Sequence, residues 1–188
     1  TLIKCVAGIH PADGGEIFFE GYPVSIHGPK DASALGIEVV YQDLALCDNL
    51  DIVQNMFLGR ETLTRLRSLN ESEMERRARE TLTSLSVTTV RSVRQQVASL
   101  SGGQRQSVAV AKAVMWNSKL VILDEPTAAL GLAQTRQVLD LVKRLGDQGL
   151  GVVIISHNLH DVFEVADRIT VLRLGRSIAE LERSKVTQ

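Results

Sequence analysis

Two short runs of residues in this chain have the types and the spacing that phosphate chemistry needs. Residues 100–104 read LSGGQ, and a hydroxyl followed by two glycines at the start of a helix can hold a phosphate. Residues 120–125 read LVILDE, an apolar strand that ends in two carboxylates, which can hold a magnesium ion and a water molecule. Found together and in this order, the two runs indicate hydrolysis of ATP.

The first run has two interpretations. As a phosphate site, the Ser101 hydroxyl acts together with the backbone N–H groups of Gly102 and Gly103, and the helix N-terminus favours negative charge. As a plain helix cap, Ser101 and Gln104 form the S-x-x-Q pattern of a capping box. Both interpretations require a helix after Ser101, so the residues alone leave them open. Ser101, Gly102, Gly103 and Gln104 are therefore the candidate ATP-binding residues.

The two carboxylates of the second run suit different tasks. Asp124 ends the strand and suits a magnesium ion that keeps several of its waters. Glu125 lies one residue further on and could orient and deprotonate the attacking water. Pro126 fixes the exit of the chain, and Thr127 is expected to cap the next turn. The plain alternative is a pair of charges at an exposed strand end.

Two further polar residues follow apolar strand patterns. His157 comes after residues 152–156 and could contact a γ-phosphate or hold the attacking water. Gln42 comes after residues 37–41 and could sense magnesium or the attacking water through its amide oxygen. A histidine at a helix start and an ordinary polar strand end are the alternatives. His160 lies three positions after His157, but no cysteine and no third histidine is nearby in the sequence, which argues against zinc.

Alternating strands and helices are predicted to position these residues. The predicted elements are strands at 16–21, 22–26, 37–41, 120–123, 152–155 and 169–172, and helices at 29–36, 132–145 and 158–165. From residue 120 onward this alternation implies a parallel sheet covered on both faces. Ligands in such folds bind beyond the carboxyl ends of the strands. Gln42, Asp124 with Glu125, and Ser156 with His157 all fall at such ends.

Residues 43–116 differ in character and are predicted to form a helical subdomain inserted after Gln42. Residues 70–73 resemble a capping box. The apolar residues that follow recur at helical spacing, which predicts one buried face: they are Met74, Ala78, Leu82 and Leu85. The composition, 44% hydrophobic and 23% charged, fits one ordinary globular core.

Charge and cysteine content exclude several other classes of protein. Lys and Arg number 21 against 22 Asp and Glu, a net charge of -1 that gives no case for a nucleic-acid surface. No run approaches the 18 or so apolar residues of a membrane span. Cys5 and Cys47 have no metal or redox spacing and are interpreted as small hydrophobic residues in a reducing cytosol.

Taken together, these residues resemble the ATP-binding subunit of ABC transporters. LSGGQ at 100–104 resembles the family's signature, residues 120–125 its Walker B strand, and Gln42 its Q-loop glutamine. His157 resembles the switch histidine. Other segments of the sequence resemble the sugar-importer subgroup that handles ribose, xylose or fructose. These segments are 8–11, 14–17, 48–53 and 59–61.

The resemblance implies a P-loop NTPase-like (RecA-like) α/β core with an inserted helical subdomain and a small antiparallel element near the N-terminus. It implies one ABC ATPase domain, with residues 1–42 and 117–188 as the core and 43–116 as the insertion. Two such domains would face each other head to tail around two ATP molecules. Each site would take Asp124 and Glu125 from one subunit and the signature from the other. Asp124 and Gln42 would hold Mg2+, while Glu125, His157 and Gln42 would serve catalysis.

The resemblance also implies partners and a location. The insertion after Gln42 would dock on transmembrane permease subunits, and a sugar-binding protein would be an indirect partner. The domain would lie at the cytoplasmic face of the cytoplasmic membrane as a peripheral subunit, with no nucleic-acid partner. A non-catalytic domain that donates its signature loop to an intact partner's ATP site is the alternative function.

The chain departs from the family pattern at two places. No G-x-x-x-x-G-K-[ST] loop occurs in the 188 residues, and Thr1 resembles the residue after that loop's magnesium-binding serine, so an N-terminally truncated domain is expected. Because this loop supplies most phosphate contacts, we expect the chain's own half-site to bind ATP poorly. Gly131 stands where the family's D-loop usually has Asp, which puts signalling between subunits through this loop in doubt.

Overall fold

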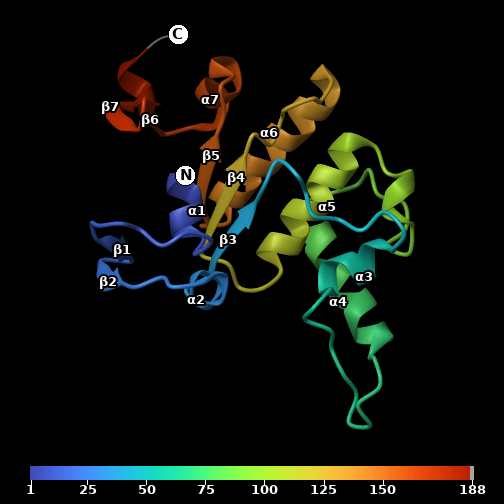
Figure 1. Ribbon diagram of the computed structural model, residues 1–188. Helices are drawn as coiled ribbons and strands as arrows, with labels where there is room; N and C mark the ends of the chain where they lie inside the picture. The colour runs from blue at the N-terminus through green and yellow to red at the C-terminus, as the bar shows by residue number, and fades with distance from the viewer. Residues whose placement is uncertain (187–188) are drawn as a thin grey trace.

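A three-stranded parallel sheet forms the centre of the computed structural model, which describes residues 1–186 (Figure 1). Its strands are β3 (Ile37–Val40), β4 (Leu120–Asp124) and β5 (Gly151–Ile155), in the order β3-β4-β5. All three were predicted from their apolar, β-branched runs, which suit a sheet covered on both faces. Residues 187 and 188, the end of the predicted core range, lie outside the described residues.

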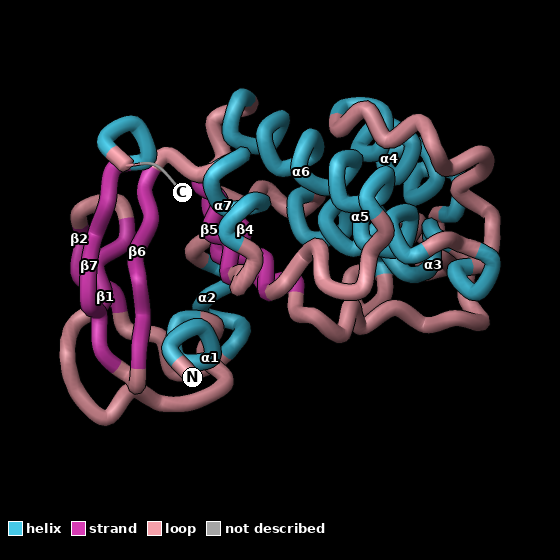
Figure 2. The backbone as a smooth tube through the Cα atoms, turned by 90° about the horizontal axis from the view of Figure 1, so that it is seen from above, coloured by secondary structure: helices cyan, strands magenta, loops and turns pink. Residues whose placement is uncertain are grey.

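Helices cover both faces of this sheet. Val121 and Leu123 of β4 pack against α5 (Gly102–Val114) and α6 (Leu132–Asp147) in the larger hydrophobic cluster. Ile122 points to the other face, where α1 (Leu2–Val6) and α2 (Pro29–Ala34) supply the smaller cluster. Figure 2 shows these two helix pairs on opposite sides of the strands. The helix α7 (Leu159–Val165) follows β5, as predicted.

The segment between β3 and α5 contains helices and no named strand in the described residues. It comprises α3 (Ile52–Phe57), α4 (Glu71–Ser84) and the short 3-10 helix η1 (Val97–Ser99). Their buried side chains share one core with β4 and α6, so the predicted boundaries of the insertion remain a prediction. None of the helices described in residues 1–186 has both the length and the apolar character that crossing a membrane requires.

The predicted capping box of α4 forms only in part. The Asn70 side chain accepts a hydrogen bond from the backbone N–H of Glu73 at 3.2 Å, as an N-cap does. The Glu73 carboxylate instead pairs with Arg76 at 2.6 Å, one turn along the helix. The helix start was therefore predicted correctly, although the reciprocal contact was not.

Two antiparallel hairpins flank the parallel sheet. β1 (Ile17–Phe19) pairs with β2 (Tyr22–Val24), which confirms the predicted N-terminal element. The expectation that residues 169–172 continue the parallel series was wrong, because β6 (Arg168–Arg173) pairs antiparallel with β7 (Arg176–Glu182). The loop between them has two residues with positive φ, Leu174 at 50° and Gly175 at 75°. Such a two-residue loop matches the twist of a hairpin and returns the chain at once.

Candidate functional site

The carboxyl ends of β3, β4 and β5 meet at one edge of the parallel sheet. Val40 is in register with Leu123, and Asp124 with Ile155, so the residues that follow each strand emerge side by side. The N–H of Glu125 donates to the Ile155 carbonyl at 2.9 Å and extends the ladder by one residue. The parallel register therefore gathers the predicted strand-end residues, as expected for a ligand site in such a sheet.

Glu125 and His157 make direct contact at this edge. Both carboxylate oxygens lie 2.9 Å from Nδ1 of His157. The hydrogen bond to Glu125, and then its negative charge, raise the pKa of His157 above its ordinary value of 6.5. The His157 side chain is 83% exposed, and contact through Nδ1 leaves Nε2 on the far side of the ring. The pair thus presents one ring nitrogen toward the outside of the molecule.

The backbone at Glu125 is strained. Its φ of 50° lies in the left-handed region that side chains other than glycine rarely adopt. Such a conformation costs about 1–3 kcal/mol and persists where the surroundings impose it. Here the buried Pro126 follows directly, and the Ala128 N–H donates to the Glu125 carbonyl at 3.1 Å. This strained backbone conformation directs the Glu125 carboxylate toward His157 and away from the direction of β4.

Asp124 and Gln42 offer oxygen ligands at the ends of neighbouring strands. Burial, and then the charge of Asp124, raise the pKa of Tyr41, the residue before Gln42. Gln42 is exposed, and its side chain makes no hydrogen bond within residues 1–186. One carboxylate and one amide oxygen fit a Mg2+ ion that is held mainly by phosphate oxygens and water. No group of three or more His, Cys, Asp or Glu in the described part of the chain would hold an ion by itself.

Asp161 is a residue of this region that the sequence did not single out. Thr127 was expected to cap the next turn, but its hydroxyl donates to Asp161 at 2.6 Å. Asp161 is only 3% exposed and lies in the first turn of α7. The contact joins the turn after Glu125 to the helix after His157 and so ties together the two segments that carry these candidate side chains. An acidic residue in a first helical turn suggests only a favourable charge at the helix N-terminus, which is why this pairing was missed.

Ser101 caps α5 in the predicted way. Its hydroxyl accepts from the Gln104 N–H at 3.4 Å, while the Gln104 side-chain oxygen accepts from the Ser101 N–H at 2.9 Å. The Gln104 amide nitrogen donates to the Thr89 carbonyl at 2.6 Å. The amide oxygen and the amide nitrogen of Gln104 thus each have a partner inside this chain, whereas Ser101 is exposed at the helix start. The capping interpretation is realised, and the exposed N-terminus of α5 still offers an environment that favours anions.

The two glycines of this run have a packing role that the sequence did not reveal. A Cβ atom on Gly102 would lie 3.0 Å from Cδ2 of Leu130, and one on Gly103 would lie 3.1 Å from Cβ of Gln134. Glycine thus allows the start of α5 to approach the start of α6 closely. Within residues 1–186, no side-chain hydrogen bond or ion pair joins residues 101–104 to the polar residues at the strand ends.

A cavity of about 240 Å³ lies beside the end of β3. Its lining includes Tyr41, Asp43, Met56, Lys112 and Trp116. Burial lowers the pKa of Lys112. The cavity therefore combines apolar and charged side chains next to Gln42, at the junction between the sheet and helices α3 and α5.

Comparison with known proteins gives concordant results. The sequence profile described as ABC transporter matches residues 1–128. The fructose import ATP-binding protein FrcA of Rhizobium meliloti is 47% identical over 193 residues, covering 100% of this chain and 74% of that protein. The xylose/arabinose import ATP-binding protein XylG of Sulfolobus acidocaldarius is 47% identical over 178 residues, covering 95% and 70%. The ribose import ATP-binding protein RbsA 1 of Rubrobacter xylanophilus is 41% identical, and this chain spans 36% of its length.

Solved structures agree with these relatives. A nucleotide-free ATP-binding cassette from an ABC transporter superimposes with a TM-score of 0.84 at 26% identity, covering 98% of this chain and 77% of that one. The cbiO1 protein of Clostridium perfringens, part of the ABC transporter complex cbiONQ, gives a TM-score of 0.79 at 25% identity, covering 98% and 72%. The predicted α/β fold class is thereby confirmed.

Proposed function

The chain belongs to the ABC transporter family, and we propose that it is the ATP-binding subunit of a carbohydrate importer. ATP binding and hydrolysis would power import across the cytoplasmic membrane. The contact between Glu125 and His157 at the sheet edge carries the proposal, because it pairs a base with a group suited to a phosphate. The relatives named for fructose and for xylose/arabinose import support a sugar as the cargo.

The strand-end residues would divide the chemistry among them. Asp124 and Gln42 would hold the Mg2+ that accompanies ATP, and the ion would neutralise charge on the phosphates. Glu125 would accept a proton from the attacking water. His157, oriented by Glu125 through Nδ1, would place Nε2 against the γ-phosphate and so help to hold the group that is transferred.

A second ATP-binding subunit would complete each site. Ser101, Gly102 and Gly103 would present the N-terminus of α5 to ATP held by that subunit, with Gln104 supporting Ser101. Within residues 1–186, no side-chain hydrogen bond or ion pair joins this group to the strand-end residues, which is compatible with a site shared between two chains. Residues 1–42 and 117–188 would form the core of each domain, and residues 43–116 its helical subdomain.

The cavity beside Gln42 would receive a permease subunit. It lies where α3 and α5 of the proposed helical subdomain meet the end of β3, so a bound partner would sense movements of Gln42. A sugar-binding protein would act with the permease. These partners would place the subunit at the cytoplasmic face of the membrane as a peripheral protein.

The proposal is tested by ATP hydrolysis in a chimaera. The 188-residue chain should bind ATP poorly by itself, because its sequence holds no phosphate loop. Placing before Thr1 the corresponding upstream segment of FrcA should produce Mg2+-dependent hydrolysis. Glu125→Gln should then reduce the rate by about 10²–10⁴-fold, whereas Glu80→Gln on the surface of α4 should leave it unchanged. An active chimaera that tolerates Glu125→Gln would contradict the assigned role.

A non-catalytic role as signature donor is the second candidate, and it would need only the exposed start of α5 at Ser101. It is tested by mixing the 188-residue chain with FrcA whose own signature serine has been replaced. Hydrolysis that depends on Ser101 in this mixture, together with an inactive chimaera, would support the donor role. An active chimaera would instead support the catalytic one.

A further inference from the structure

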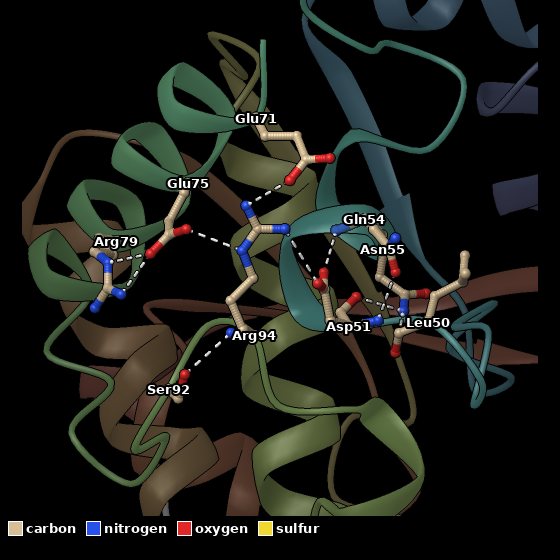
Figure 3. Close-up of polar contacts among 9 residues, drawn as sticks. All are labelled: Leu50, Asp51, Gln54, Asn55, Glu71, Glu75, Arg79, Ser92 and Arg94. Carbon is tan, nitrogen blue, oxygen red and sulfur yellow. Dashed lines mark hydrogen bonds and ion pairs between the residues drawn. The ribbon is translucent and has the colours of Figure 1, made fainter. Parts of the chain in front are cut away.

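Arg94 lies at the centre of a cluster of charged residues from three separate segments (Figure 3). Its Nε lies 2.9 Å from Glu75, and its two terminal nitrogens lie 3.2 Å from Glu71 and 3.4 Å from Asp51. Glu71 and Glu75 belong to the first two turns of α4, and Asp51 is the N-cap of α3. One guanidinium therefore joins both helix starts to the segment that leads into Ser101.

The backbone around Arg94 is bound to the same region. The N–H groups of Ile52 and Val53 donate to the carbonyls of Gln95 and Val93, each at 3.2 Å. In the other direction, the N–H of Val97 donates to the Leu50 carbonyl at 3.0 Å. Three backbone hydrogen bonds thus join residues 93–97 to residues 50–53, and the Arg94 guanidinium adds its ion pairs to the same region.

The two hydrogen-bonded segments, 50–53 and 93–97, each lie close in sequence to candidate functional residues. Residues 43–49 connect Gln42 to the first segment, and the fully buried Asn55 holds them by accepting from the Cys47 N–H at 2.7 Å. On the other side, six residues separate Arg94 from Ser101, and the last four of them are η1 and the buried Leu100. A movement of α3 would therefore be transmitted to the start of α5, because only a short, hydrogen-bonded stretch of chain lies between them.

We propose that Arg94 is a positioning residue that couples the starts of α3 and α4 to the N-terminus of α5 and so sets where Ser101 and Gly102 are presented. The importance of that position rests on the proposed function of residues 101–104, whereas the coupling itself does not. In this role Arg94 touches no nucleotide. It acts through the segment that it holds.

Arg76, which lies on α4 with Glu71 and Glu75, shows the contrast. Arg76 pairs with Glu73 and Glu80, both at 2.6 Å, but both partners lie on α4 with it. Such pairs support one helix and fix nothing outside it. The contact between Arg94 and Asp51 spans 43 residues of sequence and constrains two segments relative to one another. Arg76 is therefore the matched control for Arg94.

The test is amide hydrogen exchange of residues 93–104 in the 188-residue chain. Arg94→Ala should speed exchange of these amides by about tenfold, as expected for losing a charge-assisted contact, while exchange in α6 stays the same. Arg94→Lys keeps the charge but lacks the several N–H donors of the guanidinium, so its exchange should be slower than in Arg94→Ala but faster than in the unaltered chain. Arg76→Ala should leave residues 93–104 unchanged.

A double-substitution cycle separates coupling from general stabilisation. Asp51→Asn removes the charge but keeps a side chain that caps α3 about equally well. It should speed exchange at residues 101–104, and combining it with Arg94→Ala should add little, because both remove the same contact. Additive effects would overturn the proposal, as would exchange that rises equally in α6. If Arg94→Ala does not fold, Arg94→Lys and Asp51→Asn carry the test.

A readout in the mixture with signature-disabled FrcA links the coupling to function. Arg94→Ala should lower the hydrolysis rate there at saturating ATP, and Arg76→Ala should not. A mixture that is inactive even with the unaltered chain would count against the proposed function of residues 101–104. The exchange result would still decide whether Arg94 couples the three helices, because it requires no nucleotide.

Discussion

The strand-end site and the region around α3 are built in opposite ways. At the strand ends, the Gln42 side chain is exposed and makes no hydrogen bond within residues 1–186, and the His157 side chain is 83% exposed and contacts Glu125. Near α3, Asn55 is fully buried and makes four hydrogen bonds, and Arg94 meets three carboxylates. Groups suited to a ligand keep unused hydrogen-bonding capacity, while the groups that hold the scaffold have little left.

Because of this difference, we expect substitutions in the two regions to affect the free energy of unfolding differently. Substitutions near α3 should lower the free energy of unfolding, because they remove buried contacts. Substitutions of exposed polar residues at the strand ends should change it little, since they remove few contacts. The comparison would fail if both regions responded alike.

The largest effect on stability is expected at Phe57. This ring is fully buried at the end of α3 and meets the Trp116 ring edge-on, with centroids 5.5 Å apart. Phe57→Ala should lower the free energy of unfolding by about 3–5 kcal/mol in urea titrations. Leu66→Ala is the control, because Leu66 is 92% exposed and its loss should cost less than about 0.5 kcal/mol. A similar loss in both variants would show that α3 is not packed as described.

Asn55 should rank second. Asn55→Ala removes the acceptor for the Cys47 N–H and the donor for the carbonyls of Cys47, Leu50 and Asp51. Each of the three carbonyls keeps a backbone donor, so the Cys47 N–H is the group that loses its partner. This loss should cost about 1–3 kcal/mol, measured by the same titration. Asn49→Ala, at an exposed position in the same turn, should be nearly neutral. A neutral result at Asn55 would mean that water replaces its contacts and that the turn is not held as proposed.

A small gain is expected at Gly131. It is the N-cap of α6, with φ -74° and ψ 161°, and it has no side chain to accept a hydrogen bond. A Cβ there meets nothing within 4 Å, so Gly131→Asp should add a cap and raise stability by a few tenths of a kcal/mol. Gly131→Ala adds a Cβ without an acceptor and should not stabilise. If both variants stabilise the chain, the cause is the unfolded state and not the cap.

Local features of this chain could be predicted from the sequence, whereas distant pairings could not. The cap formed by Ser101 and Gln104 joins residues three apart, and β4 is a continuous apolar run, so both follow from short-range pattern. The contact of Thr127 with Asp161 joins residues 34 apart, and hydroxyl and carboxylate side chains have many other partners. The antiparallel pairing of β6 was missed for a similar reason, because strand periodicity does not identify the partner strand.

The parallel register also explains why the strand-end site was predictable as a group. The sequence placed Gln42, Glu125 and His157 after three apolar runs, and parallel pairing brings such positions to one edge. The strained φ of Glu125 and its contact with His157 were beyond prediction, because both depend on the turn at Pro126. The predicted roles of these residues await measurement.

The central claim is that Glu125 and His157 act as a pair, and NMR titration of the His157 ring in the 188-residue chain tests it most directly. The pKa of His157 should exceed 6.5 and should fall back toward 6.5 in Glu125→Gln. Because the folded-state pKa is raised, the pair's contribution to stability is fully present below pH 6.5 and is lost as the pH rises through the folded-state value. A His157 pKa that Glu125→Gln leaves unchanged would contradict the pairing and the mechanism that depends on it.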